Sequence, residues 1–422
     1  MNRVINTTKV SRVPQDPDNV YLDLNITNLK SANTNPVPIN FNENRNSPVV
    51  SNSGMYNLSI VRFSLETQTL PIFIPIIAST DPTTGLPNTD PNLTIYSVTM
   101  SYLKQSTGVT YTQQTYIEWS PQNTLTPTPP PPSSNPSGLQ AESVYYYCFS
   151  FTWWVNLIQN AMFNCWIDLV SQVTAGDLDD IPPPIIQFNP DNQTCSVSCP
   201  SPSFDTYIPN TTFPFTPPAP NPYAVKLFFN APLFNLFSSF PATLSNYSST
   251  QGETFQLLVS NFGGSNQIYY PTSGDPNADP PTSYLYTQIF QEYSTIENWT
   301  PVSAIVFTTS TIPVIPNQVS APLIYVEGAV LSNNTGNNSN FQLVLTDLES
   351  GDLCYKPQLQ YSPTAEYRRI SLTGTSPLSN IQVSVYWKTK MGVLIPFLLG
   401  SGSSATIKML FTKVSSIYNE EN

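Results

Sequence analysis

Three carboxylates lie close together at Asp177, Asp179 and Asp180, and such oxygen ligands could bind a hard cation. They follow a segment with helical spacing and precede a run of prolines. The three residues lack the spacing and the closing glutamate of a known calcium loop. We therefore favour a solvated loop at the end of a helix, with ion binding as the alternative.

Two further carboxylate pairs could in principle cleave glycosidic bonds, because that chemistry requires only two acidic side chains. The pairs are Glu292 with Glu297 and Glu349 with Asp352. A chain with 27 acidic residues brings such pairs together by chance, so the spacing alone is weak evidence. We assign no catalytic residue on this basis and keep a carboxylate-only glycosidase as a minor alternative.

Five cysteines are present, of which only Cys195 and Cys199 are close in sequence. A zinc site would need a second pair of ligands, which Cys148, Cys165 and Cys354 do not obviously supply. A disulfide between Cys195 and Cys199 stays open, although reduced thiols are the usual state in a cytosolic product. We expect small core or loop thiols, and we assign no metal ligand and no cofactor.

The chain contains no histidine, which removes the usual general base at neutral pH and the commonest zinc ligand. It also contains no phosphate-binding glycine loop of the known kinds. The net charge is −12 and the 15 basic residues are spread along the chain, so direct binding of nucleic acid is not expected. No apolar run is long enough to cross a membrane. These observations favour a protein that is not an enzyme.

Aromatic side chains gather just before and within the segment with helical spacing, and they could form a platform for a carbohydrate or a receptor. Because they join that segment directly, we favour packing in the core or at a subunit interface. The residues are Tyr145, Tyr146, Tyr147, Phe149, Phe151, Trp153 and Trp154.

Runs of alternating or β-branched residues recur along the chain, and turn-forming residues end each run. Such a density of strands predicts an all-β sandwich or barrel. The runs are Val20–Ile26, Tyr56–Phe63, Leu93–Leu103, Tyr223–Asn230, Thr254–Val259, Val302–Thr309, Phe341–Leu345, Tyr367–Leu372, Ile381–Trp387 and Ala405–Phe411.

One segment differs, because the apolar residues between Phe151 and Val173 recur at helical spacing. We predict a central amphipathic helix over 151–173, which the prolines at 182–184 prevent from continuing. Residues 121–138 and 271–282 are rich in proline, and we expect both to be long exposed loops.

The C-terminal part of the chain resembles a known family. The run QEYSTIENWTPVSAIVFTTSTIPVIPNQ (Gln291–Gln318), followed by AEYRRISLTGTSPLSNIQVSVYWKTKMGVLIPFLLGSGSSATIKMLF (Ala365–Phe411), is similar to the minor capsid (penton) proteins of virophages, polinton-like viruses and adintoviruses. A weaker similarity is present in FNAPLFNLFSSFP (Phe229–Pro241). The resemblance implies a jelly roll and pentamers that close the fivefold vertices of an icosahedral capsid.

This resemblance, taken with the strand pattern, predicts the organisation of the chain. We expect an N-terminal arm at 1–19, a first β region at 20–120 that forms part of a jelly roll, a loop-rich insertion at 121–284, and C-terminal jelly-roll strands at 285–422. A second β domain or insertion stays open. The resemblance further implies a homopentamer, contact with a major capsid protein, synthesis in the host cytoplasm and a place in the virion. The alternative function is a receptor-binding or adhesive spike on the virion surface, which the proline-rich loops and the aromatic residues suggest.

Overall fold

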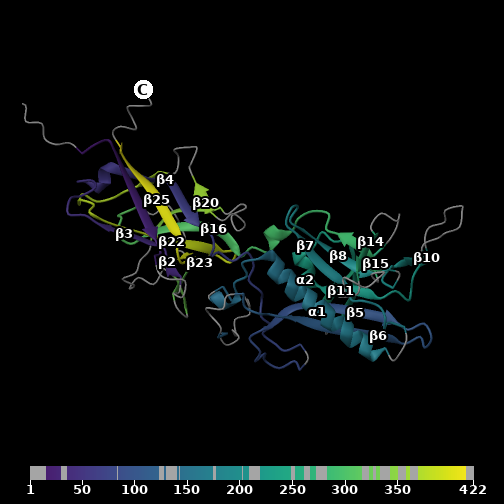
Figure 1. Ribbon diagram of the computed structural model, residues 1–422. Coiled ribbons are helices and arrows are strands. Elements are labelled where there is room, and N and C mark those ends of the chain that lie inside the picture. Colours follow the sequence, from purple (N-terminus) through teal and green to yellow (C-terminus); the bar gives the residue numbers. More distant parts are fainter. Residues whose placement is uncertain are drawn as a thin grey trace, which may run out of the picture. The chain divides into compact units, whose positions relative to one another are not determined.

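The protein is mostly β, with several antiparallel sheets in two sandwich-like bodies and one long helix (Figure 1). The chain divides into two compact units: the first comprises Met1–Leu70 and Val302–Asn422, and the second comprises Pro71–Pro301. The computed structural model describes residues 16–29, 36–82, 84–122, 128–129, 140–141, 143–173, 177–201, 203–208, 219–248, 252–260, 267–271, 283–315, 323–326, 329–332, 343–349, 358–361 and 369–414.

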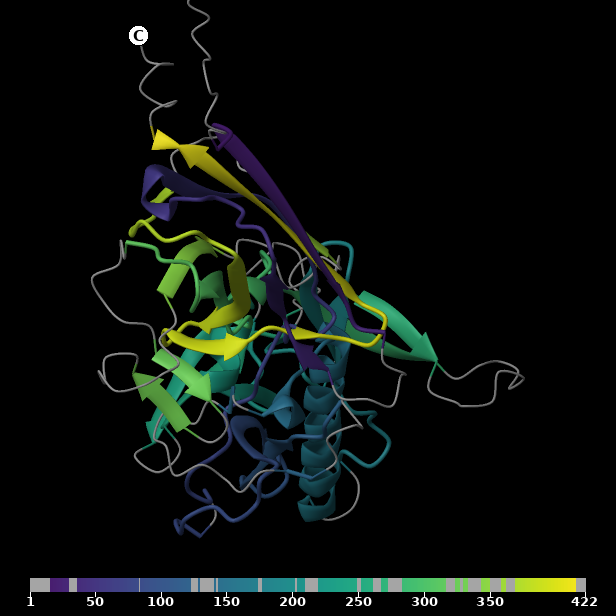
Figure 2. The same ribbon diagram turned by 90° about the vertical axis from the view of Figure 1, so that its left-hand side faces the viewer.

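One sheet of the first unit is built around the last strand of the chain. In spatial order its strands are β1 (Asn19–Thr27), β25 (Ser404–Lys413), β4 (Tyr56–Glu66) and β20 (Gln358–Tyr361), and β21 (Ile370–Ser371) also pairs with β4. All of these pairs are antiparallel. Figure 2 shows β1 and β25 side by side, so the beginning and the end of the described chain lie in neighbouring strands.

The other large sheet of the first unit joins strands from both ends of the chain. In spatial order it contains β18 (Ala329–Ser332), β17 (Leu323–Val326), β23 (Val393–Pro396), β22 (Asn380–Thr389), β16 (Val302–Thr309) and β19 (Leu343–Glu349), and β3 (Asn40–Asn44) also pairs with β22. A small ladder joins β2 (Val37–Pro38) to β24 (Leu398–Leu399), and the turn η1 (Ser53–Met55) precedes β4.

The core of the first unit lies between these two sheets. Along β25 the side chains of Ile407, Met409 and Phe411 are buried, whereas the residues between them are only half-buried. This alternation is the one that the sequence predicts for a strand with one covered face. The rings of Phe63 in β4 and Phe307 in β16 lie 5.0 Å apart, so aromatic side chains from the two sheets meet in the core.

The second unit contains a five-stranded and a four-stranded sheet. The first has the order β12 (Ala242–Ser248), β13 (Gly252–Leu257), β11 (Lys226–Asn230), β5 (Leu93–Leu103) and β6 (Thr110–Glu118). The second has the order β14 (Gln267–Pro271), β15 (Ser283–Phe290), β8 (Thr194–Pro200) and β7 (Ile185–Asn189), and β9 (Tyr207–Ile208) pairs with β10 (Ala219–Pro220). Single turns of helix lie at η2 (Val144–Tyr146) and η3 (Ile296–Asn298).

The long helix α1 (Phe151–Gln172) lies along β5 and β6 on one side and contacts β7 on the other (Figure 1). Its buried residues recur at intervals of three and four, which confirms the amphipathic helix that the sequence predicts. The short helix α2 (Ala231–Leu236) is capped at its N-terminus by Asn230, whose side chain accepts a hydrogen bond from the Leu233 backbone NH. No helix in the described part of the chain has both the length and the apolar character that a membrane span requires.

The unit boundaries at 70/71 and 301/302 differ from the sequence-derived ranges, which placed boundaries at 120/121 and 284/285. The expected first β region at 20–120 contributes β1 and β4 to the first unit and β5 and β6 to the second. Most of the proline-rich segments 121–138 and 271–282 lies outside the described residues.

Candidate functional site

The carboxylates that follow α1 lie at the surface of the second unit. Asp177, Asp179 and Asp180 are exposed, and the Tyr102 hydroxyl of β5 donates a hydrogen bond to Asp177 Oδ2 at 3.2 Å. Burial, together with this bond to Asp177, raises the pKa of Tyr102 to about 12. In the described part of the chain, no three His, Cys, Asp or Glu side chains are grouped so that they could hold a metal ion. Asp177 thus has a structural partner in β5.

Of the two carboxylate pairs, only Glu292 with Glu297 lies within the described residues. Glu292 and Glu297 are both exposed in the segment that follows β15. Glu349 ends β19, whereas Asp352 lies outside the described residues. Glu292 and Glu297 therefore lie at the surface, whereas glycosidases use a buried environment to give their two carboxyl groups different roles.

Cys195 and Cys199 lie on the same face of β8, and both thiols are buried and free. Four residues of extended strand separate their Cα atoms by about 13 Å. A disulfide needs a separation below about 7 Å, so the disulfide that the sequence left open does not form. Burial raises the pKa of Cys195 to about 12. The pKa of Cys199 is raised mainly by burial and also by the nearby Asp205. Such thiols are inert at neutral pH.

The two cysteines near α1 are buried in the same way, and burial raises the pKa of both Cys148 and Cys165 to about 12. Cys354 lies outside the described residues.

The aromatic cluster before α1 points into the second unit. Tyr145, Tyr146, Tyr147 and Trp154 are buried, whereas Phe149, Phe151 and Trp153 are half-buried. The three tyrosine hydroxyls donate to Asn92 Oδ1 at 2.8 Å, to the Pro91 carbonyl at 2.9 Å and to the Ala141 carbonyl at 2.7 Å. The Trp154 ring lies 4.5 Å from that of Phe73 and 5.3 Å from that of Tyr96. These contacts confirm core packing as the role of the cluster and leave no open aromatic platform there.

A row of charges crosses the outer face of the sheet that contains β1, β25 and β4. Asp23 Oδ1 lies 3.7 Å from Arg62 Nη2, and Asp23 Oδ2 lies 3.4 Å from Lys408 Nζ. The Lys408 ammonium also lies 5.2 Å from the centre of the Tyr21 ring. Because these side chains are exposed to solvent, the row contributes little to stability and mainly determines the charge pattern of this face.

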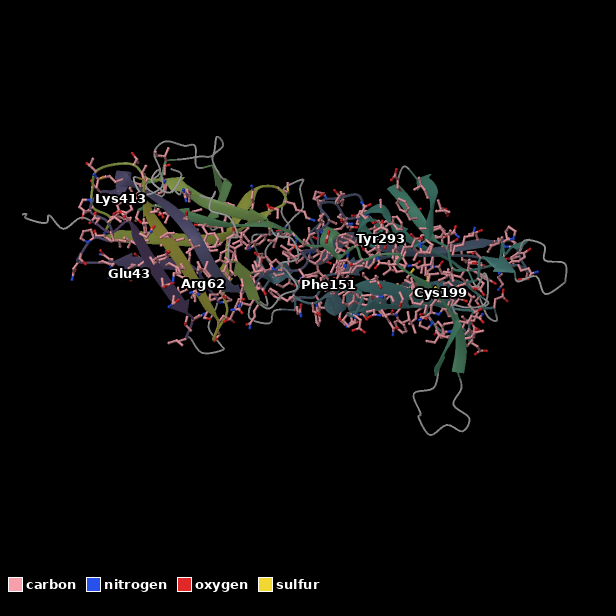
Figure 3. All side chains as sticks on the ribbon, turned by 90° about the horizontal axis from the view of Figure 1, so that it is seen from above. Glu43, Arg62, Phe151, Cys199, Tyr293 and Lys413 are labelled. Atoms are coloured by element: carbon pink, nitrogen blue, oxygen red, sulfur yellow. The ribbon has the colours of Figure 1, made fainter. Side chains whose placement is uncertain are left out.

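Several large apolar side chains remain exposed, and sequence reasoning did not single them out. On α1 they are Phe163 and Ile167, which lie one helical turn apart and outside the buried face. Phe290 ends β15, and Tyr293 follows it three residues later; 61% of Tyr293 is exposed. Figure 3 labels Tyr293 on the second unit. Subunit interfaces are enriched in side chains of this kind. The sequence did contain a sign of these residues, because Phe163 and Ile167 lie outside the three- and four-residue repeat of the buried side chains on α1.

Three comparisons relate this chain to known proteins. A family model described as Sputnik minor capsid protein V18/19 matches residues 20–413. The chain is 32% identical over 162 residues to the uncharacterized protein V18 of Sputnik virophage, a match that covers 38% of this chain and 90% of that protein. It is 25% identical over 191 residues to the structural protein V19 of the same virus, which covers 45% of this chain and 82% of that protein.

Solved structures show the same fold over nearly the whole chain. A chain in the cryo-EM structure of the Sputnik virophage superposes with a TM-score of 0.70 at 23% identity, covering 95% of this chain and 99% of that one. The crystal structure of the mavirus penton protein superposes with a TM-score of 0.56 at 14% identity, covering 94% of this chain and 100% of that one. The two-unit architecture is therefore shared with these proteins as a fold.

Proposed function

The chain belongs to the family of the Sputnik minor capsid protein V18/19, and we propose that it forms the pentamers that close the fivefold vertices of an icosahedral virophage capsid. As a member of this family it is a structural component of the virion and not an enzyme. The observation that carries the proposal is the match of its fold, over nearly the whole length of both chains, to the mavirus penton protein.

The strand order of the first unit supports a jelly roll. In chain order, its principal strands are β1, β3, β4, β16, β19, β20, β22 and β25. One sheet places the first strand beside the eighth, then the third and the sixth. The other places the second beside the seventh, then the fourth and the fifth. A long hairpin that is rolled into two facing sheets has this order, which is the arrangement of two Greek keys in a jelly roll.

The second unit enters this jelly roll between β4 and β16, its third and fourth strands. We propose that Pro71–Pro301 is one large insertion, in place of the shorter insertion at 121–284 that the sequence indicates. Both ends of the insertion lie at prolines, and the flanking strands belong to different sheets of the jelly roll. An insertion at such a connection leaves the pairing of both sheets unchanged.

A closed ring of five copies requires two different surfaces on each subunit, because each interface in a ring joins unlike patches. Each surface would bury about 800 Å² in an interface of standard size. Since the net charge of the chain is −12, neutral and aromatic side chains suit these surfaces better than ion pairs. Contact with a major capsid protein at the rim of the pentamer completes the proposal.

Native mass spectrometry of the purified full-length chain tests the pentamer directly. We expect a species of five times the chain mass of 46.7 kDa, and ring-shaped particles in negative-stain electron microscopy. In the virion, cryo-EM density for this chain should lie at the fivefold vertices. A monomer or trimer that binds glycans would contradict the proposal and favour the adhesive spike, and density elsewhere in the capsid would contradict the vertex position.

The exposed pair on α1 offers a variant with a matched control. Replacing Phe163 and Ile167 by serine removes apolar surface, whereas replacing Asn160 and Asn164 by serine changes the same exposed side of the helix without removing apolar surface. If α1 lies in the subunit interface, only the first double variant lowers the fraction of pentamer. An equal fraction of pentamer in both variants places the interface elsewhere on the subunit.

A further inference from the structure

Among the described residues of the second unit, three buried side-chain oxygen atoms lack a hydrogen-bond partner; one is Thr115 Oγ1, and the other two lie near β8 and β15. These two are Asp205 Oδ1 and Thr287 Oγ1, and each atom exposes less than 1 Å² to solvent. Asp205 as a whole is 3% exposed, and Thr287 is fully buried. An unpartnered buried polar atom is costly, and an unpartnered buried carboxylate oxygen more so. Each of the two atoms therefore calls for a ligand.

The strand pairing places Thr287 on the same face of the sheet as Ser201, the residue that holds the Asp205 carboxylate. Thr287 of β15 lies opposite Cys199 of β8, so their side chains share one face of the sheet. Ser201 follows Cys199 by two residues, and its backbone NH continues the ladder by donating to the Leu285 carbonyl at 2.8 Å. The Ser201 hydroxyl then donates to Asp205 Oδ2 at 2.7 Å, which turns the Asp205 carboxylate back over this face.

The electrostatic environment of the Cys199 thiol agrees with this placement. The pKa of the thiol is raised first by burial and then by the negative charge of Asp205, an effect that requires proximity within a low-dielectric interior. Cys199, Ser201, Asp205 and Thr287 therefore form one buried polar cluster, which we call the Asp205 cluster.

We propose that Asp205 and Thr287 hold a buried water molecule between Asp205 Oδ1 and Thr287 Oγ1. A water can donate to the carboxylate oxygen and can either donate to or accept from the hydroxyl. Buried waters usually make about three hydrogen bonds to polar groups that have no other partner, and the Cys199 thiol is available as a third. A cation such as calcium requires about six to eight oxygen ligands. The described residues contain no metal-binding group of three His, Cys, Asp or Glu side chains, which disfavours that occupant.

This water would connect the turn that follows β8 to the strand pair β8 and β15. The same turn contacts several other elements of the second unit. The Phe204 ring lies 5.5 Å from that of Trp166 in α1, the Val225 backbone NH donates to the Ser203 carbonyl at 2.8 Å, and the Thr206 backbone NH donates to the Val259 carbonyl at 2.9 Å. The Asp205 cluster therefore stabilises the connection between the two sheets of this unit and α1.

Replacing Thr287 by valine tests the proposal through the sign of the effect. If a water holds the hydroxyl, the valine variant loses a hydrogen bond and opens more readily, by about fivefold in the opening equilibrium. If the hydroxyl has no partner, the variant relieves a buried unsatisfied group, and opening becomes rarer or stays unchanged. Because the thiol is buried, the rate at which a thiol reagent labels Cys199 in the full-length protein, measured by mass spectrometry of its peptide, reports this opening.

A matched variant separates hydration from packing. Thr287→Ser keeps the hydroxyl and loses the methyl group, whereas Thr287→Val keeps the methyl group and has a second methyl in place of the hydroxyl. If the water is present, Cys199 should be labelled faster in Thr287→Val than in Thr287→Ser. If Thr287 serves packing alone, the order should be reversed, and that result would overturn the proposal. Labelling of Cys148, which belongs to the aromatic core before α1, should stay the same in both variants.

The second partner is tested by Asp205→Asn, alone and together with Thr287→Val. Because one water joins both side chains, the two substitutions should not act independently on the labelling rate of Cys199. The change in rate in the double variant should differ at least about threefold from the product of the changes in the two single variants. Additive effects would overturn the shared water. Exchange of sodium for potassium, or addition of a chelator, should leave the labelling rate of Cys199 unchanged. A labelling rate that depends on the cation would show that the occupant is an ion and would overturn the proposed water.

Discussion

Replacing Phe411 by alanine tests whether β25 carries the core of the first unit. The Phe411 side chain is fully buried, and Phe411 pairs with Val20 of β1 and with Leu58 of β4. Because strands flank it on both sides, the surroundings can collapse only a little into the space that alanine would leave. Such a substitution costs about 3–5 kcal/mol, out of a total stability of about 5–15 kcal/mol for a typical domain.

The two units can be followed separately in one sample, because Trp387 is the only tryptophan in residues 1–70 and 302–422. Fluorine NMR of the protein labelled with fluorotryptophan resolves its signal from those of the second unit. During urea unfolding the midpoint of the Trp387 signal should fall by about 1 M or more in Phe411→Ala, given slopes of about 1–3 kcal/mol per molar urea. The signals of the second unit should keep their midpoint.

Thr412→Ala is the matched control, because Thr412 follows Phe411 on β25 but is only half-buried. Its effect should stay within about 0.5 kcal/mol. A midpoint for Phe411→Ala equal to that of Thr412→Ala would refute the assignment of β25 to the core. Removal of residues 401–422 deletes the whole strand with the buried side chains of Ile407, Met409 and Phe411. A native Trp387 signal in that truncated chain would refute the same reasoning.

Three further predictions concern the loop, the thiols and assembly. Replacing residues 121–138 by a short Gly/Ser linker should change the free energy of unfolding by less than about 1 kcal/mol, because loop length enters only logarithmically; a collapse of the fold in circular dichroism would show that the segment is packed. Burial raises the pKa of Cys148, Cys165 and Cys195 from 9.0 to about 12. Above about pH 9 the unfolded thiols release protons that the folded thiols keep, so the stability is fully present below pH 9 and falls as the pH rises toward 12. Urea midpoints under reducing conditions measure this loss, and the triple alanine variant should show a smaller one. The fraction of pentamer in sedimentation velocity should rise with salt, because screening weakens the repulsion between acidic subunits; dissociation with added salt would show that ion pairs hold the interface.

Local sequence patterns were sufficient to predict a strand where one face of that strand is buried. Leu93–Leu103 and Val302–Thr309 are strands over the same residues that the sequence indicates, because alternating or β-branched residues mark a pleated surface with a buried side. The pattern missed Thr110–Glu118, which forms β6 at the edge of its sheet. Most of its residues are only half-buried, so polar and apolar residues do not separate there.

The positions of the residues that could take part in catalysis or binding were harder to predict from the sequence. The absence of histidine and the burial of the four described cysteines agree with a structural role. The sequence shows the first directly, whereas for the thiols it left core and loop positions open. The exposed Phe163 and Ile167 went unnoticed, because an apolar residue in a helix is assumed to face the core unless its neighbours are known. The Asp205 cluster could not be found from spacing, since Thr287 and Cys199 are far apart in the chain and meet only through the pairing of β8 and β15.

The sequence by itself determined the β character of the chain, the single long helix, the family resemblance and the absence of imidazole chemistry, because each depends on residue type or on a repeat within a short window. Only the tertiary structure decided which strands pair, where the second unit begins and ends, and which side chains remain exposed. The residues before Pro71 and after Pro301 belong to one unit because β4 pairs with β25, and β16 lies in the facing sheet. No local pattern encodes contacts between segments that far apart. Such pairings follow from how the buried faces of all the strands fit together, which is a property of the whole chain.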